Sequence, residues 1–325
     1  MKAKINTAGL MSILTKWGIV ITILFLLALF GVLMPNTFLT VSNMTTILRS
    51  ISIVTVIAIG VTISLAVNGF DLSVGSTATF SASLIMTMFI WYELSTIPSL
   101  IITLIVILSV AVINSLLIVK FKVPDTLATL ASMFIFQGVA MTYSGGGSVS
   151  QNMIRLNGVA TTGKVPALFL KFGQAPWIIL IMLMIVIGVH IFLTYTKHGR
   201  YMYTVGGNIE AARLSGIAVD KYRTLAYFMS TTFAAMGGIL IAARVGSAQI
   251  NAGSGYLMPA VAAAYIGFSF GGLGKANAIG TLAGALLIGI LENGLVMLSV
   301  PYYSLDIVKG LVLAVALGST YFRKK

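Results

Sequence analysis

Residues 98–119 read PSLIITLIVILSVAVINSLLIV, an apolar run in which no side chain carries a charge. An α-helix needs roughly 20 predominantly apolar residues to cross the hydrocarbon core of a bilayer. The run is long enough, and its polar residues are only small Ser, Thr and Asn side chains. This stretch therefore predicts a transmembrane helix.

Similar runs lie on both sides of this one. Because spans of about 17–25 apolar residues can cross a bilayer, we expect transmembrane helices at 17–34, 50–67, 75–90, 98–119, 124–144, 177–195, 225–244, 257–273, 277–299 and 304–320. The span 257–273 contains Pro259 and ends in a glycine cluster, so a broken or re-entrant helix is the alternative there. The sequence thus predicts an all-α polytopic membrane protein with about ten transmembrane helices, forming one domain over residues 1–325.

The composition excludes most soluble classes of protein. The chain is 58% hydrophobic and 8% charged, whereas soluble domains carry roughly 25% charged residues. The net charge of +13 is divided by long apolar runs, so no continuous basic face for nucleic acid is expected; the basic residues should instead meet anionic membrane lipids. Without cysteine, neither a disulfide framework nor a Cys-based metal site can form.

The distribution of Lys and Arg predicts the orientation. Most of the 20 basic residues fall in the inner segments when both termini are cytoplasmic, as the positive-inside rule requires. Trp17, Trp91 and Trp177 each lie at an expected helix end, where the indole ring favours the headgroup region. The longer loops are then extracytoplasmic at about 145–176 and cytoplasmic at about 196–224.

Two short segments suggest an internal duplication. Asn114-Ser115-Leu116-Leu117 and Asn293-Gly294-Leu295-Val296 each precede a proline, and in the expected topology they run in opposite directions across the membrane. Inverted repeats place substrate sites at their interface. The segments predict an inverted repeat, with coincidence as the alternative.

Residues 68–76 read NGFDLSVGS and interrupt the helical pattern with two glycines and a carboxylate. Asp71 and Ser73 can cap the helix that follows. Irregular backbone at membrane depth must face protein or water, so one interpretation is a gate or path lining made by Asn68, Asp71, Ser73 and Ser76. The other is a tight structural turn.

The expected inner loop contains GGNIEAARLSGI at 206–217. Asn208 suits an N-cap, Glu210 lies in the first turn where the helix dipole favours a negative charge, and Gly216 suits a C-terminal cap. This pattern predicts a short helix between glycines at the cytoplasmic face. Such a helix can dock into a groove of another protein or be a connector without a partner.

Three motifs resemble one family. Residues 69–76 resemble a pattern in the permeases of bacterial sugar-type ATP-binding-cassette (ABC) importers, the ribose, xylose, arabinose and autoinducer-2 group. Residues 206–217 resemble the coupling segment of that family, and residues 267–301 resemble its C-terminal region. The similarity runs from about residue 40 over nearly the whole chain. Phe70 and Asn68 depart from the family pattern, which leaves the sugar open.

The resemblance implies a permease of the bacterial cytoplasmic (inner) membrane that works with other subunits. These are cytoplasmic ABC ATPase subunits, an extracytoplasmic solute-binding protein, and a second permease, either a copy of this chain or a related one. ATP and Mg²⁺ are then expected on the ATPase, and no cofactor on this chain. The residues expected to couple to the ATPase are Gly207, Asn208, Glu210, Ala211, Ala212, Arg213 and Gly216.

The chain offers little for catalysis of its own. Residues 158–164 match the first seven positions of a phosphate-binding loop, but Val165 replaces the Ser or Thr that ligates Mg²⁺. The segment also falls in the expected outer loop, away from cellular ATP. The two histidines, His190 and His198, form no metalloprotease motif. We therefore do not expect an enzyme.

Three charged residues, Glu292, Asp306 and Lys309, fall within expected spans. Such residues are costly in lipid and often functional. Asp306 and Lys309 lie three residues apart and can pair on one helix face. Glu292 has no local partner, and with Asn293 it is a candidate to line the path.

Ala276, Gly280 and Gly284 recur at four-residue spacing in the ninth span. Small residues at this spacing allow helices to approach closely. We expect them to pack against another helix of the same subunit, with a contact between subunits as the alternative.

The leading interpretation is an importer permease that alternates its access, with the binding protein on the outer loops and the ATPase pushing on residues 208–216. The alternatives are a stand-alone ion-coupled transporter or channel, for which Asp71 and Glu292 are the carboxylates available, and a membrane scaffold. A scaffold would not need glycine breaks at membrane depth.

Overall fold

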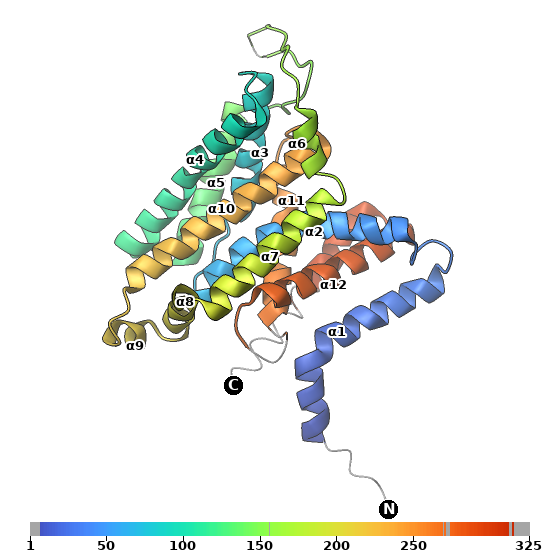
Figure 1. Ribbon diagram of the computed structural model, residues 1–325, viewed down its shortest axis with the longest axis vertical. Helices are drawn as coiled ribbons and strands as arrows, with labels where there is room; N and C mark the ends of the chain where they lie inside the picture. The colour runs from blue at the N-terminus through green and yellow to red at the C-terminus, as the bar shows by residue number, and fades with distance from the viewer. Residues whose placement is uncertain (1–6, 156, 269, 271–273, 312–313, 315–325) are drawn as a thin grey trace, which may run out of the picture.

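The computed structural model describes residues 7–155, 157–268, 270, 274–311 and 314. These residues form a bundle of helices, and between them they contain only two isolated β-bridges and no strand (Figure 1). The predicted all-α architecture is confirmed for this part of the chain.

Most of the helices follow one another with short connections. The helices are α1 (Thr7–Leu33), α2 (Val41–Ala66), α3 (Val74–Ile90), α4 (Thr96–Ser115), α5 (Asp125–Tyr143), α6 (Ala167–Phe172), α7 (Trp177–Tyr195), α8 (Lys197–Gly207), α9 (Ile209–Leu214), α10 (Val219–Val245), α11 (Ser254–Phe268) and α12 (Ala278–Met297). The long loop between α5 and α6 is the main exception to the short connections. A π-helical turn, η1 (Leu116–Lys120), extends α4, a 3-10 turn, η3 (Tyr302–Ser304), follows α12, and residues 305–311 are helical.

A helix lies over each of the first nine predicted spans. Six are long and apolar enough to cross a membrane, namely α2, α4 with η1, α5, α7, α10 and α12. Shorter apolar helices are formed by 17–33 of α1, by α3 and by α11. About half of the tenth predicted span, 304–320, lies outside the described residues. The helices indicate a multi-pass membrane protein, while the number of ten crossings, the inverted repeat and the cytoplasmic termini stay predictions.

Several predicted boundaries differ from the structure: α1 begins at Thr7 rather than at residue 17, and α10 begins at Val219 rather than at residue 225. α2 begins at Val41 rather than at residue 50, because Thr40 caps it by accepting from the Asn43 backbone N–H at 3.3 Å. The polar residues of this first part bond to their own helix, as Thr45 does to the Val41 carbonyl. α11 is continuous through Pro259 over Ser254–Phe268, so it is not broken at that proline.

The core of the bundle is α3. Every residue of α3 is buried, because α2, α4, α5, α10 and α11 pack around it. α10 also packs along α2, while α12 packs against α11 and α2. α1 contacts mainly α12 and reaches away from the bundle (Figure 1). The hydroxyl-rich α3 is therefore surrounded by protein rather than lipid, and several of its hydroxyls bond to protein, as Ser81 does to the Ala235 carbonyl and Thr87 to the Tyr143 hydroxyl.

Small residues set the closest helix contacts. A Cβ on Gly280 would lie 2.3 Å from the Gly267 carbonyl oxygen, and one on Gly284 would lie 2.3 Å from the Ala263 carbonyl oxygen. Both contacts join α12 to α11, so the predicted packing of this small-residue face within the subunit is confirmed.

We expect Gly238→Ala to destabilise the bundle. A Cβ at Gly238 would lie 2.1 Å from the Ala78 carbonyl oxygen, so α10 would have to move away from α3 at a cost of about 1–3 kcal/mol. The measurement is the melting temperature of the detergent-purified protein. Gly188→Ala on α7 is the control, because nothing lies within 4 Å of its Cβ position. Equal melting temperatures for the two variants would contradict the close approach of α10 and α3.

Candidate transport and coupling sites

The break in the helical structure between α2 and α3 is stabilised by backbone hydrogen bonds. The Asn68 N–H bonds to the Leu65 carbonyl at 3.0 Å and the Gly69 N–H to the Ser64 carbonyl at 2.9 Å. Asn68 has a φ of 56°, in the left-handed region that Asn tolerates. A Cβ at Gly69 would lie 2.6 Å from the Tyr227 hydroxyl, so only glycine fits at that point.

Asp71 lies at the centre of a buried hydrogen-bond cluster. Its Oδ1 accepts from the Ser73 backbone N–H at 2.9 Å and from Ser73 Oγ at 2.6 Å, and its Oδ2 accepts from Ser230 Oγ at 2.7 Å. Asn114 Nδ2 donates to Ser73 Oγ at 3.0 Å. The cluster joins the break to α10 and α4. All four side chains are buried, so the arrangement is sensitive to the loss of any acceptor.

The prediction that Asp71 and Ser73 cap α3 is wrong. Asp71 accepts the N–H of Ser73, which precedes the helix, and not an N–H of α3 itself. The Ser73 side chain makes no cap bond, because its hydroxyl is already used by Asp71 and Asn114. Ser76 bonds back to the Ser73 carbonyl at 2.9 Å. Of the four predicted gate residues, Asp71, Ser73 and Ser76 are buried and only Asn68 is exposed.

A second polar cluster, missed in the sequence, lies beside the break. Asp125, the first residue of α5, pairs with Arg223 and accepts from the Tyr227 hydroxyl at 2.5 Å. The Arg223 and Asp125 side chains are only 16% and 15% exposed. The signal in the sequence is the spacing of Arg223, Tyr227 and Ser230, which places polar side chains on one face of α10.

The predicted coupling segment folds as a short helix. Asn208 caps α9, since its Oδ1 accepts from the Ala211 N–H at 2.9 Å. Glu210 and Arg213 form an exposed ion pair at 2.9 Å, and Gly216 follows the helix with a φ of 74°. A Cβ at Gly207 would meet nothing within 4 Å. The prediction of a capped helix in this loop is confirmed.

α9 turns most of its surface outward. Ala212 is its only buried residue, whereas Leu214 is 89% exposed. The exposed Leu214 therefore contributes no packing within this chain. Sequence reasoning did not single out Leu214. α8 and α9 lie at one end of the bundle and the α5–α6 loop at the other (Figure 1).

α8 anchors α9 to the bundle. The Tyr203 hydroxyl donates to the Ala276 carbonyl at 2.7 Å, and Lys275 lies over the Tyr203 ring at 4.6 Å. Burial raises the pKa of Tyr203 to about 12, so the hydroxyl keeps its proton for this bond at any physiological pH. A Cβ at Gly206 would lie 2.3 Å from the Ala66 carbonyl oxygen. α8 therefore contacts the end of α2 directly.

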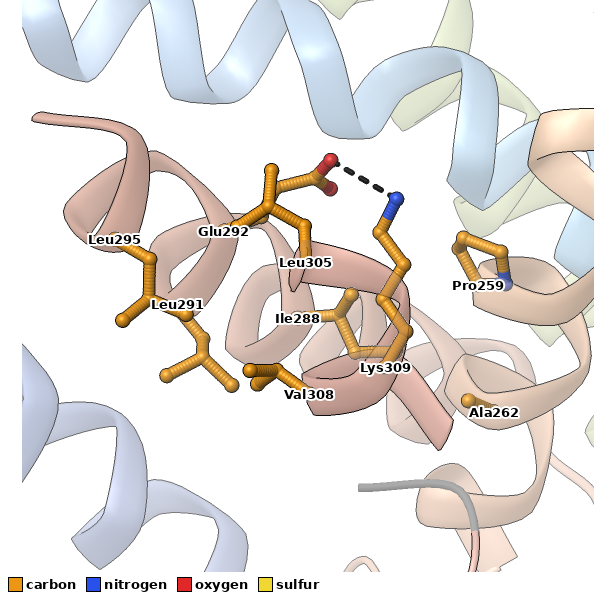
Figure 2. A pocket seen from close by; sticks show the side chains of 9 residues that line it. All are labelled: Pro259, Ala262, Ile288, Leu291, Glu292, Leu295, Leu305, Val308 and Lys309. Carbon is orange, nitrogen blue, oxygen red and sulfur yellow. Dashed lines mark ion pairs between the residues drawn. The ribbon is translucent and has the colours of Figure 1, made fainter. Parts of the chain in front are cut away.

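The intramembrane charges form a small ion network. Lys309 Nζ lies 3.2 Å from Glu292 (Figure 2). It also lies 3.5 Å from Asp306. The predicted Asp306–Lys309 pair is confirmed. Glu292 has no partner nearby in the sequence, as expected, but Lys309 returns beside α12 from further along the chain and pairs with it. The pair edges an otherwise apolar pocket between α11, α12 and residues 305–309. Asn293 lies elsewhere on α12 and exchanges two hydrogen bonds with Asn43, at 3.0 and 3.1 Å.

The loop at 145–176 packs over one end of α3. Val149 and Ala248 form a β-bridge, and a Cβ at Gly163 would lie 2.5 Å from the Ile90 carbonyl oxygen. The phosphate-loop likeness at 158–164 is followed by extended chain until α6 begins at Ala167. A phosphate-binding loop needs a helix directly after it. In the described parts of the chain, no group of three His, Asp or Glu side chains could hold a metal ion.

Comparisons with known proteins agree with the motifs. The family model described as "Branched-chain amino acid transport system / permease component" matches residues 43–317. The ribose import permease protein RbsC of Escherichia coli is 33% identical over 91% of this chain and 90% of its own. The galactose/methyl galactoside import permease protein MglC of Escherichia coli is 32% identical over 99% of both chains. The xylose transport system permease protein XylH of Haemophilus influenzae is 28% identical over 94% of this chain and 96% of its own.

No solved structure matches this chain significantly. The family match nevertheless spans far more than half of the sequence, and the similar sugar permeases are covered almost end to end. The chain therefore belongs to this family of importer permeases, together with the permeases of sugar-type ABC importers.

Proposed function

We propose that this chain is the membrane subunit of an ATP-driven importer and that α9 receives the force from a separate ATPase. The observation that carries the proposal is the geometry of α9, a capped helix with one buried residue and an exposed leucine at the end of the bundle. An exposed helix of this kind fits a groove on a partner protein. Gly207, whose Cβ position has nothing within 4 Å, leaves α9 room to move relative to α8.

The proposed substrate is a monosaccharide. The names of the relatives give ribose, galactose or methyl galactoside, and xylose as what those proteins carry. An external solute-binding protein would deliver the sugar to the end of the bundle that carries the 145–176 loop. A second permease, identical or related, would complete the pore in the bacterial inner membrane.

The proposed gate is the break between α2 and α3. Asn68, Asp71, Ser73 and Ser76 are its polar residues, and Phe70 contacts the Tyr265 ring of α11 at 6.0 Å between centroids. Because the break bonds to α4 and α10, its position depends on both helices. Glu292 and Asn293 are proposed to line the translocation path. Both lie in the second half of α12, away from its start at Ala278.

The test is purification of the tagged protein from its native membranes under mild detergent, with identification of the co-purifying subunits by mass spectrometry. A stoichiometric ATPase with a complete phosphate-binding loop, and uptake of ribose, galactose or xylose by the reconstituted complex, is the expected result. A clean oligomer without any ATPase would refute the proposal. It would favour a stand-alone transporter, in which the buried Asp71 and the paired Glu292 would be tested as ion-coupling groups.

We expect Gly207→Trp to uncouple ATP hydrolysis from uptake without unfolding the subunit. Nothing lies within 4 Å of the Cβ position of Gly207, so the large indole side chain would contact the partner ATPase rather than this chain. The measurement is sugar taken up per ATP hydrolysed in proteoliposomes. Gly188→Trp, which is equally open but lies on α7, is the control. Unchanged uptake per ATP in Gly207→Trp would show that the coupling assignment is wrong.

A further inference from the structure

One face of α10 carries three polar side chains that bond to other helices. Arg223, Tyr227 and Ser230 follow each other at spacings of four and three residues, so they share a face and cover about 10 Å of helix. Arg223 and Tyr227 both bond to Asp125 of α5. Ser230 bonds to Asp71 in the break. The face therefore connects one end of α10 to the break between α2 and α3.

The same end of α10 is tied to α9. α9 ends at Leu214 and α10 begins at Val219, and the two helices pack against each other. The Ile217 N–H bonds to the Ala212 carbonyl at 3.0 Å, which closes the short connection. A displacement of α9 must therefore move the first turns of α10, where Arg223 lies.

The first turn of α5 holds the break from the other side. Thr129 lies one turn after Asp125 and donates its hydroxyl proton to a carbonyl at either Asp125 or Phe70, at 2.8 and 3.1 Å. Its oxygen accepts the Leu72 N–H at 3.2 Å. Movement of this turn is thus passed directly to the backbone of the break.

Asp125 connects the contacts made by α10 with those made by the first turn of α5. Tyr227 is fully buried, and its hydroxyl fills the space that a side chain at position 69 would need. The Arg223 guanidinium pairs with the Asp125 carboxylate, so that charge is not left unpaired in this largely buried place. These contacts therefore couple the positions of α5, α10 and the break between α2 and α3.

We propose that Asp125 is a positioning residue which, through Arg223 and Tyr227, makes the break between α2 and α3 follow the movement of α9. This inference rests on the proposed coupling of α9 to an ATPase, and it adds the route by which that coupling reaches the gate. Asp125 contacts no substrate in this role. It fixes the first turn of α5 to the moving end of α10.

The test uses the complex of this chain with its co-purifying ATPase and binding protein in proteoliposomes. Tyr227→Phe removes one hydrogen bond to Asp125 and keeps the ring. Because a hydrogen bond to a charged group is lost, we expect uptake per ATP hydrolysed to fall about tenfold, while the ATPase still assembles and hydrolyses ATP. Thr232→Val is the control, since the Thr232 hydroxyl bonds only to the Phe228 carbonyl of its own helix.

A second variant covers a failure of the first to fold. Asp125→Asn combined with Arg223→Gln removes both charges, so no unpaired charge stays buried, and the same fall in uptake per ATP is expected. Uptake per ATP equal to that of Thr232→Val in either folded variant would overturn the inference, as would loss of assembly in both, which would make the cluster purely structural. A wild-type complex without ATP-driven uptake would instead refute the proposed function itself.

Discussion

Replacing Asp71 by alanine is expected to abolish uptake and to lower the melting temperature more than any other single change discussed for this chain. Three donors, the Ser73 N–H, Ser73 Oγ and Ser230 Oγ, lose their acceptor in a fully buried place. Each unsatisfied buried donor costs about 1–3 kcal/mol, and water cannot replace the carboxylate inside a membrane bundle. The sum approaches the total stability of a typical domain, about 5–15 kcal/mol.

The measurement is thermal unfolding of the detergent-purified protein together with uptake in cells. Asp71→Asn is expected to be milder, since its amide oxygen still accepts from Ser73 and the Ser230 hydroxyl can rotate to accept from the amide group. Asp220→Ala is the matched control, because Asp220 forms only an exposed ion pair with Lys122 at 3.2 Å. Such pairs contribute about 0–1 kcal/mol. If Asp71→Ala melts like Asp220→Ala, the buried cluster does not hold the break.

The membrane helices were predictable because each depends on its own composition. The runs at 98–119 and 177–195 correspond to α4 with η1 and to α7 within a few residues. The start of α2 was not predictable from hydropathy, since polar residues before Ser50 are satisfied by bonds within their own helix. The continuity of α11 through Pro259 likewise depends on its packing between α2 and α12.

The candidate sites show the same difference between features that depend on local sequence and features that depend on helix packing. Asn208 was predicted as a cap because its partner, Ala211, lies three residues away. Ser230, which bonds to Asp71, and Arg223, which bonds to Asp125, lie about a hundred or more residues further along the chain, so only the packed bundle brings these pairs together. Glu292 shows the same limit, because its partner Lys309 lies on a segment that returns beside α12. A single sequence predicts local features such as helix caps. Predicting a buried hydrogen-bond network also requires knowing how the helices pack against one another.

Leu214→Ala is expected to release the ATPase while leaving this subunit intact. The side chain is 89% exposed, so its loss removes no packing within the chain, and the melting temperature should not change. If Leu214 is a hot spot of the interface, its truncation costs about 2 kcal/mol or more, which weakens binding by roughly thirtyfold. The measurement is the amount of ATPase retained by the purified permease in a titration of mild detergent or salt.

The control for Leu214→Ala is Ile97→Ala on α4, which removes a comparable aliphatic side chain that is 71% exposed and lies away from α9. It should retain the ATPase fully. Full retention by Leu214→Ala as well would mean that α9 is not anchored through its leucine. Docking would then depend on the Glu210–Arg213 pair, but exposed ion pairs of this kind contribute little, and the assignment of α9 as the ATPase contact would have to be abandoned. A selective loss with Leu214→Ala would locate the anchor at the end of α9, where Gly216 gives the chain its turn into α10 and hence its connection to the break at Asp71.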